Sequence, residues 1–173
     1  MNLFRRRRSV PAGLKPALEA DERVLAWAAV SDTEILVATN RGLWLPGGRR
    51  LDWHEIHKAA WSGQELRITP AVVAEKREGY TVQADAPVES FRLPSPGELP
   101  DQVRTRVTRS VAYTTYHAMP TGGVRVVGRR VAGRDGLTWT VRYDSGTPVE
   151  VPAVVELTDE LVASAQGATA PRD

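Results

Sequence analysis

Short runs in which apolar and polar residues alternate dominate the chain between positions 23 and 93. Turn-forming residues separate the runs, among them Ser31-Asp32, Asn40-Arg41-Gly42 and Pro46-Gly47-Gly48. Asn and Gly readily adopt positive φ angles, so the turn at Asn40–Gly42 is expected to use them. The apolar runs cover 24–30, 35–39, 43–45, 66–69, 72–76, 80–84 and 88–93. This pattern is typical of an antiparallel sandwich or a small barrel.

The period of the pattern changes after Pro94–Pro96. Residues at helical spacing then form one apolar stripe, which consists of Leu99, Val103, Val107, Val111, Thr114 and Ala118. The segment 95–98 has the pattern of a capping box, but Pro100 lacks an N–H donor and moves the expected start of the helix toward itself. The sequence predicts one long helix over 99–118.

Residues 124–143 predict a β-hairpin. Leu137, Trp139, Val141 and Tyr143 alternate with polar residues, so the ring of Trp139 is expected in the core. Asp135-Gly136 favours a type I′ turn between the two strands. Further along, 152–166 carries apolar residues at helical spacing with Pro152 at its start, which predicts a helix, while a strand through 149–157 is the alternative.

Composition limits the classes of protein that the chain can belong to. The 173 residues include no cysteine, which excludes disulfides, cysteine-ligated metals and thiol nucleophiles, and fits a reducing cytosol. No apolar run approaches the ~20 residues that a membrane span requires. A cytoplasmic location is therefore expected, with peripheral attachment to the inner membrane as an option.

Positive charge is concentrated at the N-terminus. The formal net charge is +2, and without the four consecutive arginines Arg5, Arg6, Arg7 and Arg8 it is −2. Together with Leu3 and Phe4, this run predicts a contact with an anionic membrane surface, to which each cation contributes ~1 kcal/mol. Like charges followed by Pro11 and Gly13 also predict that the tail, 1–20, is disordered.

Several of these segments together resemble the pleckstrin-homology-like fold, including its bacterial PH and GRAM types. They are 23–30, then 35–39 followed by 40–45, and the Leu51-Asp52-Trp53-His54-Glu55-Ile56 stretch, with 99–118 in the place of the closing helix. The resemblance implies an α+β chain with a small antiparallel β-barrel closed by one amphipathic helix at 21–119, and a hairpin–helix module appended at 123–168. The whole arrangement also resembles uncharacterised actinobacterial proteins.

Motifs for catalysis are absent from the sequence. His54 and His57 are three residues apart, so on a strand they point to opposite faces and cannot hold one metal ion. Neither a nucleophile elbow nor a phosphate-binding glycine loop occurs. We therefore expect no catalytic residue, no cofactor and no metal, and the pleckstrin-homology resemblance also favours a protein that is not an enzyme.

One face of the predicted helix combines arginine and tyrosine. Arg106, Arg109, Tyr113 and Tyr116 project to one side, a composition that suits a protein interface or contacts with phosphates and bases. Trp44, next to the loop at Pro46, is the tryptophan expected to be most exposed. The resulting hypothesis is a non-enzymatic binding or scaffold protein with a protein partner. The alternative is a nucleic-acid- or ribosome-associated protein, which the acidic net charge of the body disfavours.

Overall fold

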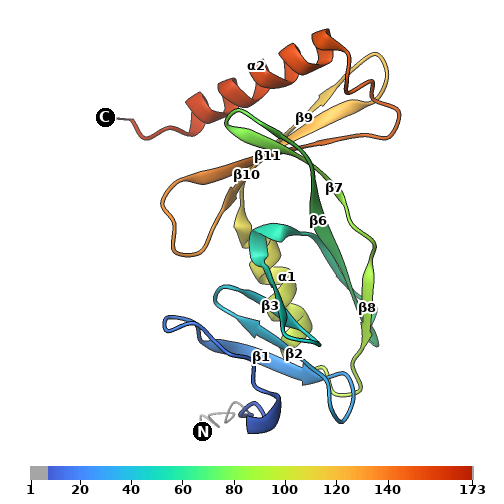
Figure 1. The fold of residues 1–173 in the computed structure, drawn as a ribbon, viewed down its shortest axis with the longest axis vertical. Coiled ribbons are helices and arrows are strands. Elements are labelled where there is room, and N and C mark those ends of the chain that lie inside the picture. Colours follow the sequence, from blue (N-terminus) through green and yellow to red (C-terminus); the bar gives the residue numbers. More distant parts are fainter. Residues whose placement is uncertain (1–7, 173) are drawn as a thin grey trace, which may run out of the picture. The chain divides into compact units, whose positions relative to one another are not determined.

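A computed structural model describes residues 8–172 of the chain. The fold is α+β, as expected, and in the described part it contains two α-helices, a strongly curled half-barrel sheet and a second sheet (Figure 1). The chain divides into two compact units. Unit 1 comprises Met1–Thr69 and Val88–Val107, and unit 2 comprises Pro70–Pro87 and Thr108–Asp173.

Unit 1 begins with an antiparallel sheet in the order β1-β2-β3-β4. Its strands are β1 (Val24–Ala29), β2 (Ile35–Thr39), β3 (Gly42–Leu45) and β4 (Arg49–Asp52). The 3-10 turn η2 (Trp53–Glu55) leads to β5 (Ile56–Trp61), the first part of β6 (Glu65–Arg77) and β8 (Glu89–Arg92), which pairs antiparallel with β6. The strands expected between positions 23 and 93 are thus largely confirmed, but the expected break at Pro70 is wrong, because 66–69 and 72–76 belong to the single strand β6. Pro70 is tolerated there because it lies between the ladder with β8, which ends at Ile68, and the ladder with β7, which starts at Ala71.

Helix α1 (Leu99–Ser110) covers the core of unit 1. Leu99, Val103 and Val107 are buried against a cluster that includes Leu36 and Ile68. The apolar stripe expected from Leu99 to Val107 is therefore confirmed.

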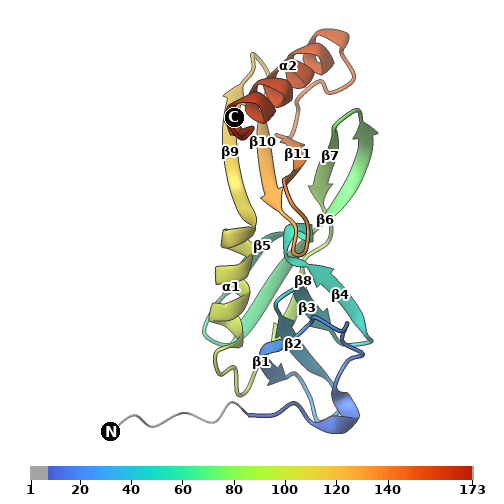
Figure 2. The same cartoon turned by 90° about the vertical axis from the view of Figure 1, so that its left-hand side faces the viewer.

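Unit 2 is a sheet covered on one face by helix α2 (Pro152–Thr169). Its order is the end of β6, then β7 (Tyr80–Asp85), β11 (Leu137–Tyr143), β10 (Gly123–Arg130) and β9 (Val111–Ala118) (Figure 2). β7 and β11 are parallel and the other neighbours are antiparallel. Val162 and Ala165 of α2 pack with Val126 and Trp139. The C-terminal helix starts at Pro152, so the alternative of a strand through 149–157 is wrong.

The prediction of a helix over 99–118 is wrong beyond Ser110. Residues 111–118 form strand β9, which pairs with β10 from Ala118↔Gly123 to Val111↔Arg129. The stretch contains one valine, two tyrosines and two threonines, residue types that pack well in strands. A valine or threonine every three or four residues fits a helical stripe by spacing alone, and the ladder with β10 overrides that spacing.

Two predictions about turns are also wrong. The β10–β11 connection spans 131–136 and is no two-residue type I′ turn, because among the described residues only glycines have positive φ. Asn40 and Gly42 likewise avoid positive φ. Gly42 is required for a different reason, since a Cβ there would lie 2.3 Å from the carbonyl oxygen of Leu51 on β4.

Residues 8–20 differ from the disordered tail expected at 1–20. The indole of Trp27 donates to the carbonyl of Arg8 over 2.8 Å, and Glu19 forms an ion pair of 3.0 Å with Arg41. The two units also differ from the expected domains 21–119 and 123–168, because 70–87 and 108–119 join the sheet of unit 2.

Substitution of Gly42 tests the close approach of β3 and β4. Gly42→Ala forces the two backbones apart and should lower the free energy of unfolding by about 1–3 kcal/mol, as overpacking does. Gly13→Ala is the matched control, because nothing lies within 4 Å of its Cβ position. Chemical denaturation of both variants gives the comparison, and equal stabilities would contradict the register of this hairpin.

Helix α2 is held to the sheet by a polar group around Arg77. Its guanidinium lies 5.8 Å from the ring centroids of both Tyr80 and Tyr143, and it donates to both hydroxyls over 3.1 and 3.0 Å. The Tyr80 hydroxyl donates to Asp159 of α2 over 2.5 Å, and the Tyr143 hydroxyl bonds with Thr158 over 2.6 Å. Burial, together with the carboxylate of Asp159, raises the pKa of Tyr80 to about 12.

The raised pKa of Tyr80 predicts a loss of stability at high pH. A tyrosine ionises near pH 10 in the unfolded chain, so the folded state loses about 2 kcal/mol as the pH rises from about 10 toward 12. Urea denaturation at pH 9 and pH 11 measures this loss. Tyr80→Phe should reduce the difference between the two values. The same difference in the variant and in the wild type would contradict the prediction.

Candidate binding groove

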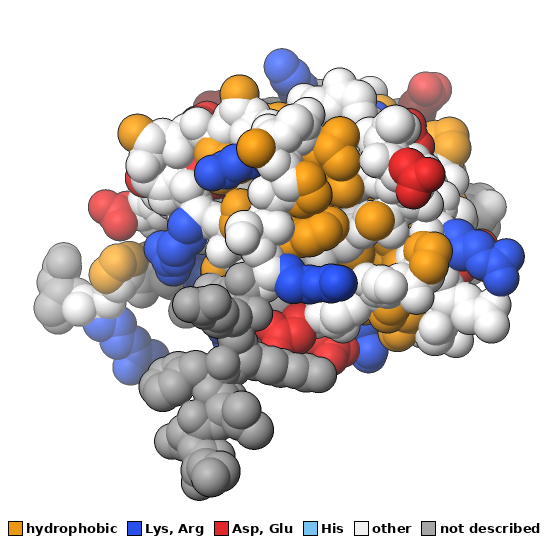
Figure 3. Space-filling view, turned by 90° about the horizontal axis from the view of Figure 1, so that it is seen from below, with side chains coloured by type: hydrophobic (Ala, Val, Ile, Leu, Met, Phe, Trp, Pro, Cys, Tyr) orange, Lys and Arg blue, Asp and Glu red, His pale blue; other side chains and the backbone are white. Residues whose placement is uncertain are grey.

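An open groove of about 840 Å³ lies on unit 1. Three segments line it: the N-terminal stretch, strand β1, and the turn into α1. The lining residues are Arg8, Ser9, Val10, Lys15, Val24, Leu25, Ala26, Trp27, Gly97, Glu98 and Asp101. In the view of Figure 3, hydrophobic side chains gather on unit 1 between Lys or Arg and Asp or Glu side chains.

The first wall is the N-terminal stretch, which is fixed to β1 by Trp27. The indole N–H of Trp27 reaches the carbonyl of Arg8, and the 3-10 turn η1 (Ala12–Leu14) follows Pro11. Val10 is half-buried, whereas Arg8 and Lys15 are exposed. This wall therefore presents one apolar side chain and two cations.

Strand β1 forms the floor and is an edge of its sheet. It pairs with β2 on one side, and no strand of the described chain pairs with its other side. Its sequence, Val-Leu-Ala-Trp-Ala-Ala, carries no charge, and a register shift between Val24 and Ala26 bends it. An uncharged edge strand offers backbone N–H and C=O groups to another extended chain.

The second wall is the turn that leads into α1. Gly97 has a φ of +54°, and the Leu99 N–H donates to the carbonyl of Pro96 over 3.2 Å, which closes the turn. Glu98 and Asp101 are exposed on this wall, and a carboxylate at the first turn of a helix is favourable to the helix dipole. The groove thus has cations on one wall and carboxylates on the other.

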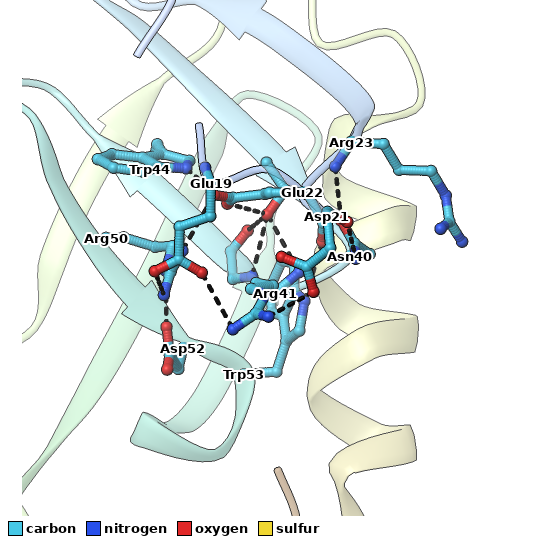
Figure 4. Close-up of polar contacts among 12 residues, drawn as sticks. Glu19, Asp21, Glu22, Arg23, Asn40, Arg41, Trp44, Arg50, Asp52 and Trp53 are labelled. Carbon is cyan, nitrogen blue, oxygen red and sulfur yellow. Dashed lines mark hydrogen bonds and ion pairs between the residues drawn. The ribbon is translucent and has the colours of Figure 1, made fainter. Parts of the chain in front are cut away.

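A buried carboxylate holds the chain that joins the first wall to β1 (Figure 4). Glu22 accepts hydrogen bonds from the Thr39 hydroxyl at 2.6 Å, the Trp44 indole at 2.8 Å and the Glu19 N–H at 3.1 Å, and Arg50 lies 3.0 Å away. Burial opposes ionisation of Glu22, but the donors and Arg50 outweigh it and hold its pKa below the ordinary value.

Trp44 differs from its expected role as the exposed tryptophan. It is partly buried, its indole N–H is bonded to Glu22, and the Arg50 guanidinium lies 5.7 Å from its ring centroid. Trp44 is therefore part of the support of the groove.

The candidate interface of Arg106, Arg109, Tyr113 and Tyr116 does not form one helical face. Arg106 belongs to unit 1, whereas the other three belong to unit 2. Tyr113 and Tyr116 lie three apart on β9 and so point to opposite faces of the sheet. The ring centroids of Tyr113 and Trp139 are 5.5 Å apart, and the Tyr116 hydroxyl donates to the Asp144 carboxylate over 2.6 Å.

The predicted membrane contact falls mostly outside the described residues. Leu3, Phe4, Arg5, Arg6 and Arg7 precede them, and Arg8 is the first described residue. No group of three or more candidate metal ligands occurs among the described residues. Of the described helices, neither combines the length and the apolar composition that a bilayer crossing requires.

Sequence reasoning missed the groove because its walls come from segments far apart in the chain. The charge-free run 24–29 and the acidic pair Glu98 and Asp101 are visible in the sequence. Only the fold brings them together with Arg8 and Lys15. Comparison of the chain with protein-family models, with curated proteins and with solved structures found no match.

Proposed function

We propose that unit 1 is a non-enzymatic protein-binding module that holds an extended segment of a partner protein in the groove along β1. The observation that carries the proposal is an uncharged edge strand that lines a groove with cations on one wall and carboxylates on the other. Main-chain hydrogen bonds to β1 would supply affinity, and the walls would select side chains.

The chemistry of the walls favours a polypeptide over a polyanion. Glu98 and Asp101 would repel phosphates, whereas an extended peptide can place a cation beside them and an acidic residue beside Lys15. Val10 and the half-buried ring of Trp27 suit one apolar side chain of the partner.

The order of elements in unit 1 supports the assignment to the pleckstrin-homology-like fold. The strands β1–β4 form one antiparallel group, β5, β6 and β8 form another, and α1 follows them in the chain. In this proposal the two groups form the barrel, and 70–87 is an excursion between β6 and β8. The cysteine-free sequence supports a cytoplasmic location.

A peptide-binding assay tests this function. Peptides are selected from a random library on the wild-type chain, and their affinities are measured by fluorescence anisotropy. Trp27→Ala, and Glu98→Lys combined with Asp101→Lys, should each weaken binding at least about tenfold. Glu156→Lys combined with Glu160→Lys on α2 is the matched charge control and should bind as the wild type does. Equal affinities for groove and control variants would contradict the proposal.

Attachment of the N-terminal tail to a polyanion is the second candidate function, favoured by the Leu3-Phe4 pair followed by Arg5–Arg8. Anionic vesicles and an RNA oligonucleotide are the probes. Replacement of all four arginines by glutamine should weaken both interactions and flatten their salt dependence. Leu3→Ser with Phe4→Ser should weaken vesicle binding only. If the glutamine variant binds vesicles and RNA as the wild type does, the proposed role of the tail is wrong.

A further inference from the structure

Strand β9 is the outer strand of the unit 2 sheet. β10 pairs with it on one side, and no strand of residues 8–172 pairs with the other side (Figure 2). β9 has eight residues, Val-Ala-Tyr-Thr-Thr-Tyr-His-Ala, without Lys, Arg, Asp, Glu or Pro. Thr114, Tyr116 and Ala118 are exposed.

The opposite end of the same sheet is protected in the usual ways. There β6 carries a register shift between Val73 and Glu75, followed by three charged residues, Glu75, Lys76 and Arg77. Charged residues on an edge strand oppose the addition of a further strand, and a bulge interrupts such pairing locally. β9 has an irregularity of its own at Ala112, which has no partner in the register with β10 because Gly128 and Arg129 pair with Tyr113 and Val111. From Tyr113 to Ala118 it carries neither a bulge nor a charge, so this part of the edge is open.

The hairpin that joins β9 to β10 shows which backbone groups of β9 point outward. The Met119 N–H donates to the carbonyl of Gly122, which makes 119↔122 a hydrogen-bonded pair. Such pairs alternate along an antiparallel ladder, so 117, 115 and 113 bond to β10. The N–H and C=O groups of Thr114, Tyr116 and Ala118 therefore point away from β10.

We propose that β9 pairs antiparallel with β9 of a second copy of this chain, about a two-fold axis at Thr115. Residues with outward backbone groups must face one another, so Thr114 pairs with the partner's Tyr116 and Tyr116 with the partner's Thr114. In this register Tyr113 lies opposite the partner's His117, and the pairing ends before the irregularity at Ala112. Thr115 then lies opposite the partner's Thr115.

A second copy fits this edge because the register is symmetric and uses the regular part of β9, from Tyr113 to His117. A shift by one residue would place the outward groups of one strand against groups of the other that already bond to β10. Charges are compatible, since no Lys, Arg, Asp or Glu of one strand meets a like charge of the other. Thr–Thr and Tyr–Thr are favourable cross-strand pairs.

A charge swap at Thr115 tests the position of the axis. The two Thr115 residues form a non-hydrogen-bonded pair, with Cα atoms ~4.5 Å apart. Thr115→Lys alone and Thr115→Glu alone should each weaken self-association at least about tenfold in sedimentation velocity. An equal mixture of the two variants should form a heterodimer. Monomers in the mixture would overturn the proposed register.

A backbone variant tests the pairing independently of charge. Thr114→Pro removes an N–H that points outward and leaves the ladder with β10 intact, as proline on an edge strand can. It should be monomeric, whereas Thr114→Val should remain dimeric, and circular dichroism shows that both are folded. A wild-type chain that is monomeric at about 100 µM, where micromolar association is nearly complete, would overturn the proposal.

Discussion

Glu22→Ala should lower the free energy of unfolding by about 3–5 kcal/mol, because it removes one partner of a buried ion pair. The side chain of Glu22 is 0% exposed, and that of Arg50 is 17% exposed. Without the carboxylate, the Thr39 hydroxyl and the Trp44 indole lose their acceptor in a buried place. Denaturation in urea, followed by circular dichroism, measures the loss.

Glu19→Ala is the matched control for this prediction. Glu19 also pairs with arginines, but its side chain is 51% exposed, so its removal should cost less than about 1 kcal/mol. The pH dependence separates the two residues further. The pKa of Glu22 is lowered in the folded state from the ordinary value of 4.5. Its contribution is therefore present above about pH 4.5 and disappears as the pH falls below it. Equal losses in both variants would contradict this role of Glu22.

Trp139→Ala should destabilise the protein by a similar amount, about 3–5 kcal/mol, as large-to-small core substitutions do. Trp139 is 8% exposed, and its ring lies over Gly128 on β10, where a Cβ would be only 3.0 Å away. The ring of Tyr113 packs against the same indole, with 5.5 Å between the two ring centroids. Chemical denaturation gives the change in free energy.

Trp139→Phe and Tyr116→Phe are the controls. The first keeps an aromatic ring over Gly128 and should lose less than half as much stability, and the second changes an exposed side chain. A loss below about 1 kcal/mol for Trp139→Ala would show that the ring is not part of the core. The sequence predicts the burial of Trp139 from alternation alone, and the structure confirms it.

Alternation and helical spacing predict most of the elements. Most strands up to Arg92, the hairpin of β10 and β11, and α2 agree with the sequence pattern, while β6 joins two expected runs into one strand through Pro70. The pattern fails at 111–118, where Val111, Thr114 and Ala118 continue a helical stripe but lie on a strand. Local spacing cannot reveal that β10 provides a ladder for these residues.

The candidate site could be predicted only in part. The arginine run of the tail is visible in the sequence but precedes the described residues, except for Arg8. Glu22 looks like an ordinary surface residue in the sequence, because its donors Thr39, Trp44 and Arg50 come from three later strands. Sites assembled from distant segments leave no local pattern.

The most direct test of a binding groove along β1 is NMR of the isotope-labelled chain with a selected peptide. We expect the largest shift changes at Val24–Trp27 and at Gly97–Asp101, and slower hydrogen exchange of the β1 amides that face the groove. Such protection would show that the peptide adds a strand to β1. Shift changes confined to unit 2, with unchanged exchange at β1, would contradict the account.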